Sequence, residues 1–227
     1  MNRFLKWFDN YWYHYKWHTI VGAFIAVFLV IVIGQMASKE KVDVYIMYAG
    51  PKSFTPAAIH EIEDAFEDIM PDLNGDGKKI VQFTDIMYLT DKKIEEYKAQ
   101  AEAEGEEYKP KMDYIQEMRE KYKLQLAAGD AYLLLLDPEV YEADYGSGMF
   151  NKLEKLGINS DKAYDDTAIS FKETDFGSYV SVFDVFPDDT LMCFKVMNVT
   201  EKARGKKEQI KFDNQLTMFK KIVEFKY

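Results

Sequence analysis

The chain of 227 residues has few of the residues on which many protein classes depend. Its single cysteine, Cys193, excludes an intramolecular disulfide framework and a zinc site built from several cysteines. Three histidines, two of them close to an apolar run, leave little material for histidine-based chemistry. Positive charge is also scarce, because 29 lysines and arginines face 39 acidic residues and the net charge is −10. An acidic chain of this kind lacks the electrostatic footprint of a nucleic-acid-binding protein.

Charged residues are absent from Trp17 to Ser38, and 19–37 is predicted to be a membrane-spanning helix. Nineteen helical residues reach about 28 Å, close to the thickness of the hydrocarbon core. One alternative is a cleaved signal peptide, whose apolar region is shorter and ends in small residues, whereas Gln35 occupies such a position here. The other is a buried core helix, which would carry a polar stripe that this run lacks.

The basic residues that flank the apolar run predict its orientation. Three precede it and two follow it: Arg3, Lys6, Lys16, Lys39 and Lys41. Short cytoplasmic tails are enriched in lysine and arginine. We therefore expect a single-pass protein of the cell membrane, with the tail 1–18 in the cytoplasm and the domain 42–227 outside the cell.

The tail is rich in aromatic side chains, several of which recur at helical spacing: Phe4, Trp7, Phe8, Tyr11, Trp12, Tyr13, Tyr15 and Trp17. Rings with an apolar body and a polar tip favour the boundary between lipid and water. The pattern predicts an amphipathic helix at the inner interface, with Trp7, Trp12, Tyr15 and Trp17 as interface residues. A simple aromatic belt without any further role is the favoured interpretation, and a helix that anchors and orients the span is the alternative.

After residue 41, β-rich segments alternate with amphipathic segments. The expected elements, in chain order, are a strand at 42–49, a helix at 55–70, a strand at 80–89, a helix ending at Gly129, a strand at 132–136 and a helix starting at Asp137. This order predicts an α/β fold, in which a mainly parallel sheet lies between two layers of helices in a three-layer domain.

Two segments depart from this alternation. Residues 91–111 are polar and charged, and are expected to form a solvated excursion with a helix over 92–104. Near the end of the chain, Tyr179–Phe186 and Thr190–Met197 predict a hairpin around Pro187–Asp189. A helix over Glu208–Phe225 is expected to close the domain.

The segment DLNGDG at 72–77 matches the first half of an EF-hand calcium loop. Asp72, Asn74 and Asp76 occupy its first, third and fifth positions, and a glycine occupies the sixth. The twelfth position, which should carry a bidentate acid, is Phe83, although Asp85 is close enough in sequence to act instead. The favoured interpretation is a tight turn without an ion. No cofactor is therefore expected, and calcium at this loop is the alternative.

Ligands of open α/β sheets bind beyond the carboxyl ends of the strands. This rule selects Tyr48 and Gly50 after the first strand, and Asp137 and Glu139 after the third. Both pairs are also compatible with ordinary strand exits.

The stretch KLQLAAGDAYLLLL at 123–136 resembles the phrase that joins the second helix to the third strand of the first lobe in extracellular solute-binding proteins of bacterial ABC importers. With the strand, helix and turn patterns around it, the resemblance spans 42–157. It implies one lobe of a periplasmic-binding-protein fold and the binding of a solute. The overall layout is similar to small single-span membrane proteins of Gram-positive anaerobic bacteria.

Together these features predict a membrane-anchored extracellular binding or interaction module without catalytic activity. Its expected partners are the lipid bilayer and either an envelope protein or a small solute, with no nucleic acid. A structural or assembly subunit of a cell-envelope complex is one alternative. A hydrolase that uses acidic residues is another, although no Ser–His–Asp or Cys–His set can be assembled from the sequence.

Overall fold

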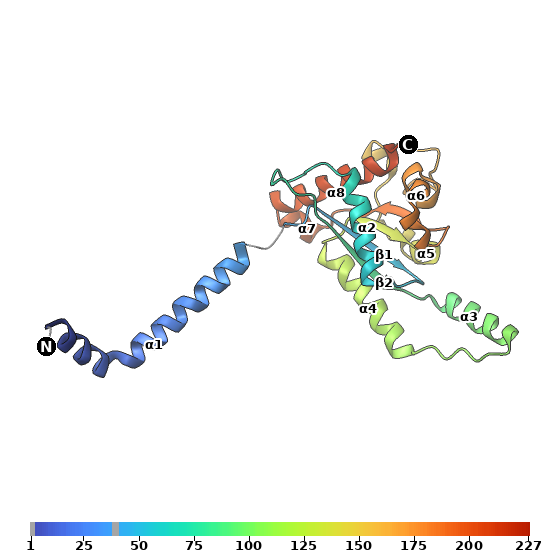
Figure 1. Ribbon diagram of the computed structural model, residues 1–227. Coiled ribbons are helices and arrows are strands. Elements are labelled where there is room, and N and C mark those ends of the chain that lie inside the picture. Colours follow the sequence, from blue (N-terminus) through green and yellow to red (C-terminus); the bar gives the residue numbers. More distant parts are fainter. Residues whose placement is uncertain (1–2, 38–40) are drawn as a thin grey trace. The chain divides into compact units, whose positions relative to one another are not determined.

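The computed structural model describes residues 3–37 and 41–227, apart from the side chains of residues 3–6, 8–10, 35–37 and 128 (Figure 1). It contains two compact units, Met1–Lys41 and Val42–Tyr227. The elements follow in the order α1 (Arg3–Ala37), β1 (Val44–Gly50), α2 (Pro56–Ile69), β2 (Val81–Met87), α3 (Asp91–Glu104), α4 (Met112–Ala128), β3 (Leu133–Leu136), α5 (Pro138–Tyr145), the 3-10 helix η1 (Leu153–Leu156), β4 (Ala168–Ser170), the 3-10 helix η2 (Phe171–Glu173), α6 (Asp175–Tyr179), the 3-10 helix η3 (Ser181–Val185), β5 (Leu191–Phe194), α7 (Val199–Ala203) and α8 (Lys206–Glu224).

The first unit is the single helix α1. Its segment Tyr11–Gly34, which contains an 18-residue window with a mean hydropathy of 2.3, is long and apolar enough to cross a membrane, a criterion that a signal sequence also meets. The rings of Trp7, Tyr11 and Tyr15 stack in succession along the helix, with centroids 5.7 and 5.4 Å apart. The predicted aromatic face is therefore present from Trp7 onward, whereas the side chains of its first members, Phe4 and Phe8, lie outside the described residues.

The second unit is an α/β domain built on a five-stranded sheet with the strand order β2-β1-β3-β5-β4. The pairings of β1 with β2 and with β3 are parallel, as the alternating pattern predicts. Strand β5 is antiparallel to both of its neighbours, so the sheet is mixed and not mainly parallel. The reason lies in the connection from β4 to β5. Ser170 at the end of β4 pairs with Leu191 at the start of β5, so the chain leaves β4 and enters β5 at the same end of the two strands.

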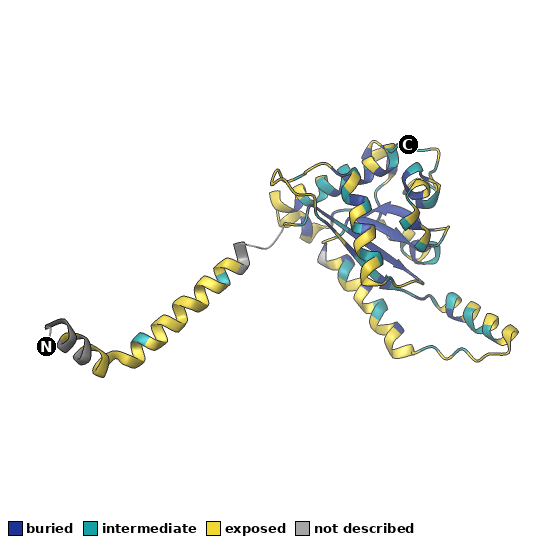
Figure 2. Ribbon diagram, in the orientation of Figure 1, coloured by how far each residue is buried: buried dark blue, intermediate teal, exposed yellow. Residues whose placement is uncertain are grey.

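Helices cover both faces of the sheet, as the fold class predicts (Figures 1 and 2). One face packs against α2, α8 and the segment from η2 to η3, and its core is rich in phenylalanine. The other packs against α4 and α5, with Tyr122 and Tyr141 in its core. Successive residues of a strand point to opposite faces, so Leu133 and Leu135 enter the first core while Leu134 and Leu136 enter the second.

The predicted hairpin near the C-terminus is wrong in its first half. Residues 179–186 contain the end of α6 and the helix η3, whereas β5 does occupy the predicted second strand. The alternating apolar residues do not face a neighbouring strand. Instead, Phe183 and Phe186 turn inward against Phe171, and their ring centroids lie 5.2 and 5.8 Å from that of Phe171. Burial of these large rings accounts for the compact helical path.

Helix α3 and the segment that follows it project from the rest of the domain (Figure 1). Their sequence has no apolar stripe, yet Ile94 is buried against Leu89 and Ile115. Arg119 of α4 donates two hydrogen bonds to the carbonyl of Leu89 and forms an ion pair with Asp91. A small apolar cluster and one arginine therefore fix the start of the predicted excursion.

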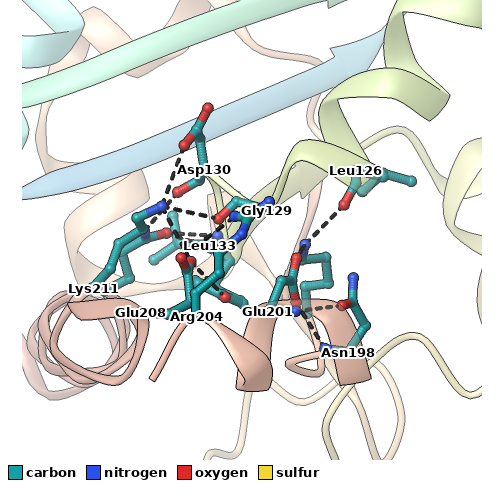
Figure 3. Close-up of polar contacts among 12 residues, drawn as sticks. Leu126, Gly129, Asp130, Leu133, Asn198, Glu201, Arg204, Glu208 and Lys211 are labelled. Carbon is teal, nitrogen blue, oxygen red and sulfur yellow. Dashed lines mark hydrogen bonds and ion pairs between the residues drawn. The ribbon is translucent and has the colours of Figure 1, made fainter. Parts of the chain in front are cut away.

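A buried polar network joins the turn between α4 and β3 to α7 and α8 (Figure 3). The ammonium group of Lys195 donates to Glu201 at 2.6 Å and to the carbonyl of Leu126 at 2.8 Å, and both charged side chains are almost fully buried. Glu201 also accepts the backbone N–H of Asn198, which caps α7. The carboxylate of Glu201 lies directly against Gly129, whose φ of 75° ends α4 in the predicted left-handed conformation.

Gly129 and Gly105 form a matched pair for testing this network. Both end helices with positive φ, but a Cβ at Gly129 would collide with the Glu201 carboxylate, whereas nothing lies near a Cβ at Gly105. Gly105→Ala should destabilise the domain by about 1–2 kcal/mol, the strain of the left-handed conformation. Gly129→Ala should destabilise it by about 3 kcal/mol or more, because displacing Glu201 leaves Lys195 buried without its partner. Urea unfolding of the full chain in detergent, followed by circular dichroism, measures both, and equal losses would contradict the prediction.

Candidate functional site

Three of the four residues predicted to bind a ligand meet at the carboxyl ends of β1 and β3. The backbone N–H of Asp137 donates to the carbonyl of Ala49, which brings the two strand ends together. Gly50 lies so close to Tyr48 and Asp137 that a Cβ would clash with the Tyr48 hydroxyl. The Tyr48 ring is buried between Phe54 and Phe186, and burial raises the pKa of its hydroxyl. This edge of the sheet is therefore closely packed.

Asp137 is nearly buried and caps α5 by accepting the backbone N–H of Glu139, as its sequence position predicts. Burial raises the pKa of its carboxyl group, and the charge of Asp189 adds to the rise against the lowering effects of the Glu139 N–H and Lys93. Asp137 is thus a partly desolvated carboxylate at a strand exit.

Glu139 turns toward the start of α3. It accepts a hydrogen bond from the hydroxyl of Thr90 and pairs with Lys92 at 2.9 Å. Burial opposes its ionisation, but the contacts with Thr90 and Lys92 outweigh burial and lower the pKa. The side chain therefore ties α5 to the α3 excursion.

The predicted calcium loop folds as a series of tight turns. The carboxylate of Asp72 accepts the backbone N–H groups of Asn74, Gly75 and Gly77, and these bonds lower its pKa. The side chain of Asn74 accepts the N–H of Asp76 in the same way. Among the residues that the structure describes, no group of three or more His, Cys, Asp or Glu side chains is gathered as for a metal ion.

Asp85, the acid that the sequence offered as a further ligand of this loop, is engaged elsewhere. Its carboxylate accepts hydrogen bonds from the hydroxyl of Ser53 and the backbone N–H of Phe54. Asp85 lies opposite Tyr48 in the sheet, toward the carboxyl end of β2, whereas the loop precedes the start of that strand. It therefore cannot complete the loop without losing both bonds.

The residues predicted for the membrane interface are all in α1. Trp7, Trp12, Tyr15 and Trp17 are exposed there. The hydroxyl of Tyr11 lies 2.9 Å from that of Thr19, which in turn donates to the carbonyl of Tyr15. The hydroxyl groups of Tyr11 and Thr19 therefore have hydrogen-bond partners within the helix itself.

A groove of about 470 Å³ opens on the second face of the sheet, between α4 and the turn that follows α5. Its walls are mainly apolar and include Tyr88, Tyr122, Leu126 and Met149. The Tyr88 and Tyr122 rings meet edge to face, with centroids 5.1 Å apart. Pockets of roughly 300–1,000 Å³ with apolar walls and a few polar groups are typical of small-molecule sites.

The polar groups of the groove have a defined charge pattern. The hydroxyl of Tyr122 donates to the carboxylate of Asp144 at 2.7 Å, and burial together with this acid raises the hydroxyl's pKa. Two lysines also line the groove, but Lys195 is paired with Glu201 and Lys123 is paired with Glu120. Asp144 is therefore the lining carboxylate without a cationic partner among the described residues, and the groove favours a positively charged group.

Sequence reasoning missed this groove because its lining comes from four separate segments. None of the predicted site residues lies in these segments. Ser147 and Gly148 also line the groove, but the carboxylate of Asp144 beside them opposes phosphate binding. The polar contact that defines the groove is between Tyr122 and Asp144. No sequence spacing indicates that these two residues meet.

A smaller hollow of about 230 Å³ lies beside η1 and contains Glu154, Asp165 and Asp166. Asp165 accepts the backbone N–H groups of Thr167 and Ala168, so it shapes the turn before β4. Asp166 pairs with Lys152 at 2.6 Å, which lowers its pKa. These two carboxylates are thus occupied by local contacts.

Comparison with protein-family models, with curated proteins and with solved structures gave no significant match for this chain.

Asp137 offers a test of charge at the sheet edge, because asparagine caps helices as well as aspartate does. A raised pKa in the folded state means that ionisation of the carboxyl group destabilises the fold as the pH rises above 3.8, the ordinary value for aspartate. Asp137→Asn should therefore unfold at a higher urea concentration than the parent at pH 7, and the difference should vanish toward pH 3. Asp137→Ala, which loses the cap, should be destabilised by about 1 kcal/mol at low pH. A gain for Asp137→Asn that does not depend on pH would contradict this account.

Proposed function

We propose that this chain is a membrane-anchored binding module that captures a small organic cation with an apolar body in the groove between α4 and α5. The groove is the observation that carries the proposal. No catalytic step forms part of it.

The anchor is α1, which is long and apolar enough to span a bilayer. We propose that it remains attached and that the tail 1–18 stays in the cytoplasm, because Arg3, Lys6 and Lys16 precede the apolar segment. The domain 42–227 then faces the outside of the cell, where a tethered binding protein meets its solute.

The resemblance to one lobe of a solute-binding protein supports the same reading. In the domain, α4 ends at Gly129 and leads directly into β3, the order that the resemblance assigns to this stretch. We propose that the mixed sheet corresponds to that lobe. Because a second lobe has no counterpart in the described residues, the ligand is held on one surface, and weak binding is expected.

The chemistry of the groove sets the ligand class. The aromatic side chains Tyr88 and Tyr122 line the groove. Tyrosine rings attract organic cations, and a neighbouring carboxylate strengthens that preference. Asp144 supplies this carboxylate, and the hydroxyl of Tyr122 holds it in place. Leu126 and Met149 provide apolar surface for the rest of the ligand. An amine with an aromatic or alkyl body fits these features better than a sugar or a phosphate does.

The orientation can be tested with protease added to intact spheroplasts. We expect the large domain to be digested and a small fragment that contains α1 to be protected. The triple variant Arg3→Glu, Lys6→Glu and Lys16→Glu should weaken or invert this pattern, because it removes the basic residues that hold the tail inside.

A matched control carries the same three charge changes within the domain, at Lys92, Lys98 and Lys109, whose side chains are 42–76% exposed. These residues lie too far from the apolar segment to affect its insertion. The control should keep the parental digestion pattern. A domain that resists protease until the membrane is lysed would contradict the proposed orientation.

Binding can be tested by thermal unfolding of the full chain in detergent with phenethylamine, using phenethyl alcohol as the neutral counterpart. The amine should raise the melting temperature more than the alcohol does. At 100 times the dissociation constant, the stabilisation is about 2.7 kcal/mol. Asp144→Asn should remove most of the difference between the two compounds, whereas Asp161→Asn, an exposed acid that does not line the groove, should leave it unchanged.

Equal responses to the amine and the alcohol, or an unchanged response in Asp144→Asn, would contradict the cation proposal. If neither compound stabilises the protein but a membrane protein is crosslinked to residues of α3, the assembly-subunit alternative is favoured. The exposed helix α3 is the feature of the domain that favours that alternative.

A further inference from the structure

A second site is indicated at the opposite edge of the sheet, where the loop 72–77 precedes β2. Asp72, Asn74 and Asp76 hold the first, third and fifth positions of a calcium loop, and Gly77 has the positive φ of 83° expected at the sixth position. The loop lacks the acid at position twelve. What it needs is a carboxylate from elsewhere in the domain.

Asp43 is placed to supply this carboxylate. It precedes β1, and its backbone N–H donates to the carbonyl of Ile80, three residues after the loop. Its side chain is only 2% exposed. One carboxylate oxygen, Oδ2, accepts the N–H of Ile80 at 3.0 Å, whereas Oδ1 has no hydrogen-bond partner among the described residues. An unpartnered carboxylate oxygen in such a buried position is costly unless a ligand satisfies it.

Asp43 lies beside the loop in the fold. Its backbone N–H and its carboxylate oxygen Oδ2 are both bonded to Ile80, which follows Gly77 by three residues. All three ligand-type residues of the loop act on its carboxylate, Asn74 through its side chain and Asp72 and Asp76 through their charges.

We propose that Asp43 completes a calcium site with Asp72, Asn74 and Asp76, taking the place of the acid that the loop lacks at its twelfth position. The backbone carbonyl of Lys78 lies at the seventh position, which supplies a main-chain ligand in loops of this kind. Every donor in this set is an oxygen atom, and hard oxygen ligands select calcium or magnesium. The spacing of the loop is that of a calcium motif.

The ion-free arrangement explains why the acids are not gathered in a cluster. Asp72 and Asp76 use carboxylate oxygens to accept backbone N–H groups at the successive turns. An ion would bind the remaining lone pairs of these oxygens, while the turns keep the loop in its present form. Because these bonds and the nearby Lys78 and Lys79 compete with the ion, we expect an affinity in the range of about 10⁻⁴–10⁻³ M that is typical of extracellular calcium modules. This site is independent of the groove.

The test is thermal unfolding of the full chain in detergent, in EGTA and across a calcium chloride series up to 10 mM, with magnesium chloride as the comparison. Calcium should raise the melting temperature by several degrees, and magnesium should do so much less. Asp43→Asn should lower the apparent calcium affinity by about tenfold or more. In EGTA the same variant should melt at or above the parental temperature, because it removes a buried charge without a partner.

Asp43→Asn should thus keep its stability in EGTA but lose stabilisation by calcium. A variant that simply misfolds would be less stable under both conditions. Asp68→Asn, an exposed acid at the end of α2 close to the loop, controls for the general loss of negative charge and should respond to calcium as the parent does. A parental protein that is indifferent to calcium would overturn the proposal. So would an Asp43→Asn variant with unchanged affinity, or a magnesium response equal to that of calcium.

Discussion

The burial of β3 on both faces is the constraint on which the rest of the domain depends. Its four residues are all leucine, and they divide between two separate cores. A strand of this composition is stable only when helices cover both sides of the sheet, which α2 and α8 do on one face and α4 and α5 on the other. The first amides of the segment also need partners. Gln215 of α8 accepts the N–H groups of both Tyr132 and Leu133, so the closing helix completes the central strand.

The ion pair between Lys195 and Glu201 follows from the same constraint. Lys195 comes directly after β5, next to the buried start of β3, and its ammonium group lies 4.9 Å from the centre of the Tyr132 ring. Taking both charges out of water offsets much of their attraction, so the intact pair adds little net stability, whereas loss of one partner leaves a buried charge unpaired. Lys195 also lines the groove, and because Glu201 pairs with it, Asp144 sets the electrostatic preference there.

Local sequence signals predicted the helices that begin or end at a capping residue. Thr55 caps α2, Asp137 caps α5 and Gly129 ends α4, each at its predicted position. Strand β4 has only three residues and offers no periodic signal. The alternation of Tyr179–Phe186 was misleading because those rings pack around Phe171 on a helical path, a contact that no local pattern encodes.

The site residues also divide into those that local sequence signals indicate and those that depend on contacts between distant segments. Tyr48, Gly50 and Asp137, which the strand-exit rule selected, lie close together because parallel strands end at a common edge. It could not place Glu139, whose direction depends on the distant residues Thr90 and Lys92. The groove was equally out of reach, because it is a gap between α4 and α5 that exists only after both have packed on the sheet. Asp43 and the loop 72–77 are adjacent only because β1 pairs with β2.

The distribution of aromatic residues has an optical consequence. All three tryptophans, Trp7, Trp12 and Trp17, belong to α1, whereas the domain contains tyrosine and phenylalanine but no tryptophan. Light at the red edge of protein absorption therefore excites α1 alone, and its emission colour reports the polarity around that helix. Tyr11, Tyr13 and Tyr15 also lie in α1, but thirteen of the sixteen tyrosines lie in the domain. Selective tryptophan excitation of the intact chain therefore reports one compact unit, whereas tyrosine emission comes mainly from the other.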